Sequence, residues 1–283
     1  MPNLSSPLNE SFKGRVSALG RTLQIVTTRK IEPRSPGKRI RRAIQQFAFL
    51  ARVAWDFIQG MRVLYPVGPC VTVFGSARLC EPADEYRLAR LLGAALAGCG
   101  LTIMTGGGPG LMEAVSRGAR ESGGRAVGCR IRVSAEQRAN IHLDRAATFR
   151  YFFVRKVMMV RNARGFVALP GGLGTLDELF EVLTLMQMKK LAERPIVFLG
   201  TAYWRPLLDF IQGMEQCGTI KPNEMALIMR LVLFTDDVNL AVAHIQGHAP
   251  SFSGATKPQA VDPGLPTPKL WTDPVPPRSI DAA

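Results

Sequence analysis

The sequence predicts an α/β protein, a Rossmann-like parallel sheet with helices on both faces and an extra N-terminal helix. Two observations predict this class. Short runs of β-branched and aromatic residues alternate with segments in which apolar residues recur every three or four positions. In addition, glycine-rich turns of small residues follow three of the short runs. Since strands that alternate with helices form parallel sheets, a ligand is expected at the carboxyl ends of the strands.

The short apolar runs predict six strands, over residues 71–74, 101–104, 125–131, 165–169, 195–199 and 231–234. A segment with helical spacing follows each strand, over residues 84–99, 111–119, 149–164, 175–190, 204–216 and 237–246. The three glycine-rich turns lie at the carboxyl ends of the first, second and fourth strands. We therefore expect these turns to line one crevice.

Four segments are expected along the chain. Residues 1–37 form a basic arm and residues 247–283 a proline-rich tail, and both are expected to be disordered. Residues 38–64 predict an amphipathic helix that covers the core domain or a second subunit. Its apolar positions include Ile44, Phe47, Leu50 and Phe57. Residues 65–246 form the Rossmann-like domain.

The formal net charge of +14 raises the question of nucleic-acid binding. The excess is concentrated at the N-terminus, because residues 1–62 hold twelve Lys or Arg and only three acidic residues. No zinc finger and no aromatic RNA-binding signature accompanies this charge. Nucleic-acid binding is therefore disfavoured, and weak contact of the basic arm with nucleic acid or an acidic partner stays open.

No apolar run approaches the ~20 residues that span a bilayer, and the N-terminus carries no basic-then-apolar signal peptide. We therefore expect a cytoplasmic protein without a membrane span. The five cysteines are scattered and lack C-x-x-C spacing, which indicates neither a disulfide framework nor a zinc site. We expect them to be small buried hydrophobic residues.

Several common chemistries are disfavoured by what the sequence lacks. It has only three histidines, and two of them fall near the end of the last helix, which disfavours a Ser-His-Asp or Cys-His system. No cluster of metal-ligand residues has the required spacing. Neither G-x-G-x-x-G after the first strand nor G-x-x-x-x-G-K-[ST] is present, which disfavours NAD, FAD and a P-loop.

The segment over residues 169–178 reads L-P-G-G-L-G-T-L-D-E and lies between an apolar run and a helical pattern. Its glycines let backbone N–H groups converge, and the start of the following helix attracts anions, so a phosphate is expected there. The carboxylates Asp177 and Glu178 come directly after the glycines and suggest a catalytic role in addition to phosphate binding. The alternative is that Thr175 and Glu178 form a capping box, which would hold Glu178 beside the phosphate turn.

Arg155 and Lys156 lie in the run F-R-Y-F-F-V-R-K, midway along the predicted helix over residues 149–164. An Arg-Lys pair in a helix usually lies on a face that is exposed to solvent. The neighbouring side chains here are large and mostly apolar, which indicates a largely buried helix. A buried cation needs an anion, and Glu178, Asp177 or a bound phosphate would serve.

Four motifs together carry a family resemblance: G-S-A-R, T-G-G-G-P-G-L-M-E-A, F-F-V-R-K and P-G-G-L-G-T-L-D-E. In order and spacing they resemble the Lonely Guy family of phosphoribohydrolases, formerly described as lysine decarboxylases. The resemblance covers about residues 65–246, and the F-R-Y-F-F-V-R-K run is similar to the longer bacterial branch. Nothing in the sequence marks a lysine as a pyridoxal phosphate Schiff base, so decarboxylation has no chemical support.

The resemblance implies hydrolysis of the N-glycosidic bond of a purine nucleoside 5′-monophosphate, AMP or a prenylated cytokinin nucleotide, without a cofactor or metal. It implies that Arg155 and Glu178 are catalytic, with Asp177 in support. Contact with the base is expected from Glu136. Contacts with phosphate and ribose are expected from Gly171, Gly172, Gly174, Thr175, Lys156, Gly106, Gly107, Gly108 and Ser76.

The chemistry fits these roles. Cleavage of a ribosyl bond builds positive charge on the sugar, which a carboxylate stabilises, while a guanidinium offsets charge on the departing base. The resemblance also implies a homodimer or larger assembly with sites at subunit interfaces. The alternative function is a non-catalytic nucleotide-binding or carrier module of the same fold, in which Glu178 only caps its helix.

Overall fold

The structure is a computed structural model that describes residues 36–68, 70–132 and 139–247. The chain divides into two compact units, residues 1–50 and 51–283. In the first unit, the described residues 36–50 are helical and belong to α2 (Pro36–Leu64). The predicted helix over 38–64 is therefore confirmed, with a start two residues earlier. The predicted arm lies outside the described residues except for 36–37, and the predicted tail except for Gly247. The expectation of disorder is wrong for these three residues, because 36–37 begin α2 and Gly247 ends α9 (Val238–Gly247).

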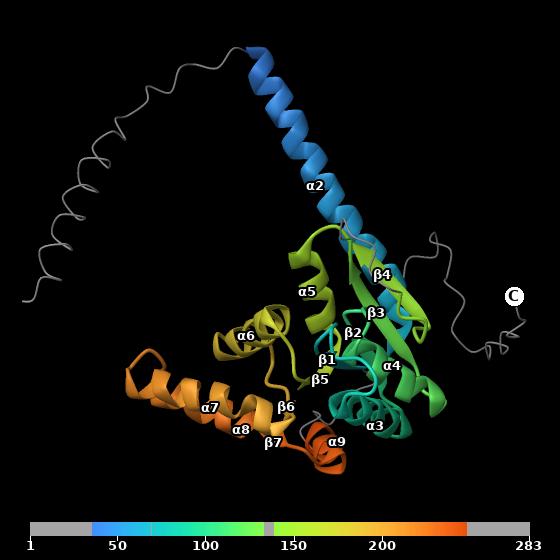
Figure 1. Cartoon of the computed structure of the whole chain (residues 1–283). Helices are drawn as coiled ribbons and strands as arrows, with labels where there is room; N and C mark the ends of the chain where they lie inside the picture. The colour runs from blue at the N-terminus through green and yellow to red at the C-terminus, as the bar shows by residue number, and fades with distance from the viewer. Residues whose placement is uncertain (1–35, 69, 133–138, 248–283) are drawn as a thin grey trace, which may run out of the picture. The chain divides into compact units, whose positions relative to one another are not determined.

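In the described part of the second unit, seven strands form one parallel sheet in the order β4-β3-β2-β1-β5-β6-β7 (Figure 1). The strands are β1 (Cys70–Phe74), β2 (Thr102–Thr105), β3 (Ala126–Ile131), β4 (Arg145–Phe149), β5 (Ala163–Ala168), β6 (Ile196–Leu199) and β7 (Val232–Thr235). The strand order reverses between β1 and β5. In open α/β sheets, such a reversal separates the carboxyl ends of two neighbouring strands and marks the usual ligand position.

Helices cover both faces of the sheet, as predicted. One face packs against the second half of α2 and against α5 (Phe152–Arg161), α6 (Leu173–Gln187), α7 (Thr201–Gln216) and α8 (Pro222–Leu231). The other packs against α3 (Asp84–Gly98), α4 (Leu111–Glu121) and α9 (Val238–Gly247). A short 3-10 turn, η1 (Tyr65–Val67), leads from α2 to β1.

The strands alternate between the two apolar cores. In β5, Phe166 and Ala168 belong to the first core, whereas Val167 and the following Leu169 belong to the second. Side chains of successive strand residues point to opposite faces, so a strand buried on both faces must be apolar throughout. This explains why the central strands could be recognised as short, continuous apolar runs.

The six predicted strands are confirmed within about two residues, but the sequence pattern missed β4 and α8 as well as the short turn η1. The prediction of a helix over residues 149–164 is wrong at both ends. β4 ends at Phe149 and α5 begins only at Phe152, and α5 ends at Arg161, before β5 begins at Ala163. As an edge strand of five residues, β4 buries only Ala147 and Phe149 well, and its short alternation was absorbed into the helical pattern. Another missed element is α8, which a Pro at its start introduces.

Cysteine burial differs from the expectation. Cys70 and Cys129 are buried in the core, and burial raises the pKa of each thiol to about 12. Cys80, Cys99 and Cys217 are exposed, so the expectation that all five would be buried hydrophobic residues is wrong for these three. They occupy turns or helix ends, where surface residues are common. None of the helices described is long and apolar enough to cross a membrane.

Candidate active site

The three glycine-rich turns meet at the carboxyl ends of β1, β2 and β5. The Ser76 N–H donates to the Pro170 carbonyl oxygen at 3.0 Å, which joins the turns after β1 and β5. The Ser76 carbonyl oxygen accepts from the Leu111 N–H at 2.9 Å, which joins the turn after β1 to the start of α4. The expectation that the three turns lie together is therefore confirmed, with Ser76 as the connecting residue.

The glycines after β2 make room for arginine side chains. A Cβ on Gly106 would lie 2.5 Å from Nη2 of Arg155, and a Cβ on Gly107 would lie 2.8 Å from Cγ of Arg130. Gly107 also has φ of +71°, which favours glycine, and its N–H donates to Oγ1 of Thr105 at 3.1 Å. This turn thus positions Arg155, a role that the sequence did not indicate. Phosphate contact by Gly106, Gly107 and Gly108 stays a prediction.

The helix after β5 begins at Leu173, with Gly172 as its N-cap, so the predicted start at Thr175 is two residues late. The capping-box interpretation is wrong, because the N-cap lacks a side-chain hydrogen bond and Glu178 binds another partner. Gly172 and Gly174 are exposed, and a Cβ on either would meet no atom within 4 Å. N–H groups in the first turn of a helix have no intrahelical acceptor, so this helix start can receive an anion.

The backbone before α6 is held from several sides. A Cβ on Gly171 would lie 2.1 Å from Oγ1 of the buried Thr175, so no side chain fits there. The Tyr203 hydroxyl donates to the Gly171 carbonyl oxygen at 2.5 Å, and the buried Trp204 donates to the Ala168 carbonyl oxygen at 3.2 Å. Both aromatic residues lie on α7, and no sequence motif indicated them. Their hydrogen bonds fix the backbone that leads from β5 into α6.

Arg155 and Glu178 form a buried ion pair. Nη1 of Arg155 donates to Oε1 of Glu178 at 2.6 Å, and Nε donates to the Cys129 carbonyl oxygen at 2.7 Å. Only 11% of the Arg155 side chain and 12% of the Glu178 side chain is exposed. Burial raises the pKa of Glu178 above its ordinary value, and the Arg155 guanidinium offsets part of that increase. Of the three anions considered for the buried arginine, Glu178, Asp177 or a bound phosphate, the structure places Glu178 against it.

Lys156, the next residue on α5, faces two other carboxylates of α6. Its Nζ lies 2.9 Å from Oε2 of Glu181 and 3.2 Å from Oδ2 of Asp177. Burial lowers the pKa of Lys156, but the hydrogen bonds that Lys156 donates to both carboxylates outweigh this effect and raise the pKa overall. Glu181 was not predicted, although it stands one helical turn after Asp177 and therefore shares its face. Phosphate contact by Lys156 stays a prediction.

Glu136 lies outside the described residues, within 133–138, so its expected contact with the base stays a prediction. In the parts of the chain that the structure describes, no group of three or more His, Cys, Asp or Glu residues is arranged to hold a metal ion. The site that remains consists of the Arg155–Glu178 pair, the start of α6 and the glycine turns.

Known proteins resemble this chain in sequence. The family described as "Possible lysine decarboxylase" matches residues 112–245. The cytokinin riboside 5'-monophosphate phosphoribohydrolase of Rhodococcoides fascians is 32% identical over 185 residues, which cover 64% of this chain and 91% of the relative. The protein of that name from Mycobacterium tuberculosis is 33% identical over 146 residues, which cover 50% of this chain and 78% of the relative.

Among solved structures, the molybdenum cofactor binding protein from Rippkaea orientalis superimposes with a TM-score of 0.49 and 20% sequence identity. The match covers 64% of this chain and 96% of the other chain.

Proposed function

We propose that this chain, which belongs to the Lonely Guy family of phosphoribohydrolases, hydrolyses the N-glycosidic bond of a purine nucleoside 5′-monophosphate. The products are the free base and ribose 5-phosphate, and the substrate is AMP or a prenylated cytokinin nucleotide. The observation that carries the proposal is the buried Arg155–Glu178 ion pair beside the start of α6.

Glu178 is the group that we assign to the developing charge on the sugar. Its Oε1 accepts from Arg155, and Oε2 has no hydrogen-bond partner among the described residues. Oε2 can therefore face the ribose or a water molecule, where a carboxylate stabilises positive charge or activates the water. Because Glu178 is largely buried, its interaction with a charged sugar is stronger than it would be in water.

Arg155 is the group that we assign to the departing base. Its Nε and Nη1 atoms are anchored by the Cys129 carbonyl oxygen and by Glu178. Nη2, which lies against Gly106, has no hydrogen-bond partner among the described residues. A guanidinium held by two of its nitrogens keeps the third in a fixed direction, so it can offset negative charge on the base without reorganising.

The substrate phosphate is assigned to the start of α6. Gly172, Gly174 and Thr175 provide first-turn N–H groups, and the glycine turn at residues 106–108 and Ser76 lie beside them. Binding the phosphate there would hold the sugar against Glu178, so that binding energy from a non-reacting group assists the chemical step. Lys156 contributes positive charge to this region while it remains paired with Asp177 and Glu181.

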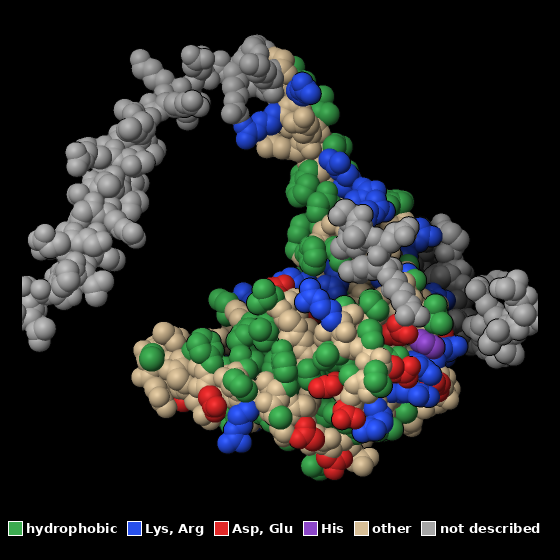
Figure 2. All heavy atoms as spheres, viewed as in Figure 1, with side chains coloured by type: hydrophobic (Ala, Val, Ile, Leu, Met, Phe, Trp, Pro, Cys, Tyr) green, Lys and Arg blue, Asp and Glu red, His purple; other side chains and the backbone are tan. Residues whose placement is uncertain are grey.

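A homodimer is proposed through the outer surface of α5 and α6. Phe152, Phe153 and Val157 on α5 and Leu173 on α6 are large apolar side chains that are 58%, 48%, 44% and 85% exposed. Figure 2 shows hydrophobic side chains gathered over these two helices. Contiguous exposed apolar surface is typical of protein interfaces. Phe153→Asp should lower the mass seen in sedimentation, and an unchanged mass would contradict this contact.

The proposed function is tested by incubating the purified chain with AMP, GMP, CMP and isopentenyladenosine 5′-monophosphate. Free base and ribose 5-phosphate are measured by chromatography. We expect equal amounts of both products from AMP or the prenylated nucleotide. Binding of both purine nucleotides without release of any base would instead support the carrier alternative.

A further inference from the structure

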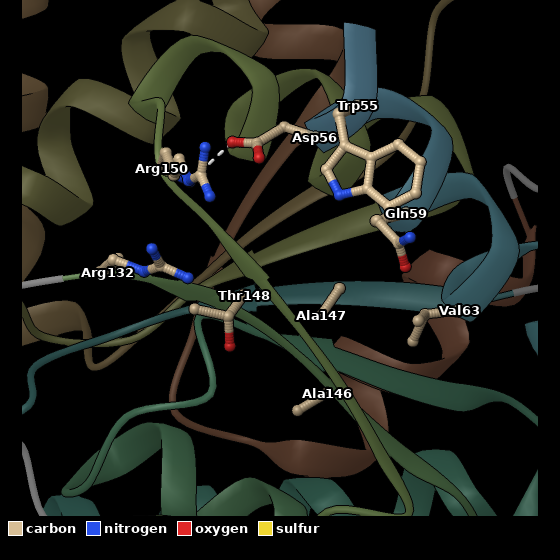
Figure 3. A pocket seen from close by; sticks show the side chains of 10 residues that line it. Trp55, Asp56, Gln59, Val63, Arg132, Ala146, Ala147, Thr148 and Arg150 are labelled. Atoms are coloured by element: carbon tan, nitrogen blue, oxygen red, sulfur yellow. Dashed lines mark hydrogen bonds between the residues drawn. The ribbon is translucent and has the colours of Figure 1, made fainter. Parts of the chain in front are cut away.

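The structure contains a cavity whose lining includes neither Arg155 nor Glu178. This cavity of about 270 Å³ lies between α2 and the end of β4, and we call it the Trp55 pocket. Its functional groups come from Trp55, Asp56, Gln59, Arg132, Thr148 and Arg150. Figure 3 shows the two arginines on one wall of the pocket, with Trp55 and Gln59 on the opposite wall.

Sheet register places the two arginines beside each other. Ile131 of β3 pairs with Phe149 of the parallel strand β4, so Arg132 and Arg150 follow adjacent strands at the same edge. The Arg132 N–H donates to the Phe149 carbonyl oxygen at 2.8 Å, which continues the pairing by one residue. Arg132 and Arg150 therefore lie side by side at the carboxyl ends of β3 and β4.

Asp56 fixes the turn that carries Arg150. This carboxylate is only 6% exposed, and its Oδ2 accepts from the Arg150 backbone N–H at 2.7 Å. The interaction holds the backbone after β4 against α2. It leaves the Arg150 guanidinium outside the hydrogen bond, on the wall of the pocket (Figure 3).

The pocket carries the positive charge of two arginines. Arg132 and Arg150 are exposed, and within the described residues neither guanidinium has a hydrogen bond or ion pair. Two adjacent cations face one carboxylate, so the local balance favours an anion. Guanidinium forks match the oxygens of a phosphate group in both geometry and charge.

The opposite wall is aromatic. Trp55 is 54% exposed although it lines a cavity, which leaves part of its indole available to a ligand. Aromatic rings stack on such surfaces, and the Gln59 amide and Thr148 hydroxyl add hydrogen-bonding groups. The volume of about 270 Å³ is just below the ~300–1,000 Å³ found for ligand pockets, which suits a small ligand rather than an extended polymer.

We propose that the Trp55 pocket is a second, non-catalytic site that binds a small aromatic phosphate, with the ring against Trp55 and the phosphate on Arg132 and Arg150. This inference goes beyond the proposed function, because no residue of the Trp55 pocket belongs to the proposed active site. It stands whether or not the chain hydrolyses nucleotides.

Phenyl phosphate is the probe, because it lacks a glycosidic bond and cannot be a substrate of the proposed reaction. Its binding to the full chain is followed by tryptophan fluorescence and by equilibrium dialysis. Replacing Arg132 and Arg150 together by Ser should raise Kd at least ~10-fold, since two charge-assisted contacts are lost. The matched control replaces Arg87 and Arg205, two other exposed arginines, by Ser and should leave Kd unchanged.

Two further comparisons separate the ring from the phosphate. Inorganic phosphate and phenol should each bind at least ~10-fold more weakly than phenyl phosphate, because each lacks one of the two contacts. Trp55→Phe should remove the fluorescence change while dialysis still detects binding. Circular dichroism confirms that each variant is folded, which is expected because the substituted arginines are on the surface.

Equal Kd values for the parent chain and the Arg132/Arg150 variant would overturn the proposal. Equal affinity for inorganic phosphate and phenyl phosphate would overturn it as well, because the ring would then contribute nothing. A single-stranded oligonucleotide that binds more tightly than phenyl phosphate, and depends on the same two arginines, would replace it with a nucleic-acid surface.

Discussion

Two neighbouring ion pairs join α5 to α6, and they differ in surroundings more than in chemistry. Arg155–Glu178 is buried, with 11% and 12% of its side chains exposed, and Arg155 is also anchored to the Cys129 carbonyl oxygen. Lys156 is 18% exposed, but its partners Asp177 and Glu181 are 59% and 29% exposed. Arg155 and Lys156 follow each other on α5 but therefore lie in different surroundings. Arg155 lies in a buried site, and Lys156 lies at a partly solvated surface.

This difference indicates separate tasks for the two pairs. A buried pair is expensive to desolvate and adds little net stability, so its presence calls for another reason, and the glycine turns around it suggest ligand chemistry. A partly solvated pair on facing helices is cheaper to form and helps to hold the helices together. We assign chemistry to Arg155–Glu178 and helix alignment to Lys156 with its two carboxylates.

The largest expected effect follows from removing one cation of each pair. Arg155→Ala leaves the Glu178 carboxylate buried without its partner and should lower the free energy of unfolding by about 3 kcal/mol. Lys156→Ala leaves two carboxylate side chains that are 59% and 29% exposed and should cost at most about 1 kcal/mol. Denaturant unfolding measures both values. Equal losses would show that the two pairs are energetically alike.

A smaller effect is expected from substituting Gly106, the glycine that lies against the Arg155 side chain. Gly106→Ala places a Cβ 2.5 Å from the present position of Nη2, so the flexible guanidinium must move. Turnover should fall about tenfold, because a misplaced charged group stabilises the transition state poorly, while the protein stays folded. Gly98→Ala is the control, since its Cβ would meet no atom within 4 Å. Unchanged turnover in Gly106→Ala would refute the positioning role.

The smallest expected effect is a displacement of the pH profile. The ionised form of Glu178 is the one that stabilises a cationic sugar, and burial raises its pKa above the ordinary 4.5. The acidic limb of kcat/KM should therefore lie above pH 4.5, with activity falling as the pH drops through the raised pKa. A limb at or below this value would contradict a desolvated Glu178.

The same pKa shift has the opposite consequence for stability. Because the folded state holds the Glu178 proton more tightly than the unfolded chain, this group contributes stability at pH values below its unfolded pKa. The contribution is lost as the pH rises through the raised folded pKa. Activity and this part of the stability should therefore change in opposite directions over the same pH range.

The sequence predicted the parts of the site that depend on local pattern. The turn containing Gly171 follows an apolar strand, and Arg155 is surrounded by large apolar residues, so both could be recognised without coordinates. The start of α6 was misplaced because Gly172 and Gly174 are poor helix formers, although the fold makes the segment helical from Leu173. Tyr203 could not be predicted, since only folding brings α7 to the Gly171 carbonyl oxygen.

The edge strand β4 is an element of the fold that the sequence pattern did not reveal. Both faces of the central strands are buried, which makes them apolar throughout, but β4 exposes Ala146 and Thr148 and has only five residues. Its period-two pattern was too short to separate from the helix that follows. The Trp55 pocket was missed for this reason, because two of its groups, Thr148 and Arg150, belong to β4 and its end.

The central claim is that Glu178 acts in catalysis while its neighbour Glu181 only aligns helices. The most direct measurement is the rate of adenine release from AMP by the parent chain, Glu178→Gln and Glu181→Gln, with AMP affinity measured in parallel. Glu178→Gln should slow release at least ~10²-fold with affinity retained, whereas Glu181→Gln should stay within about threefold. Adenine release by Glu178→Gln at the parental rate would contradict the claim.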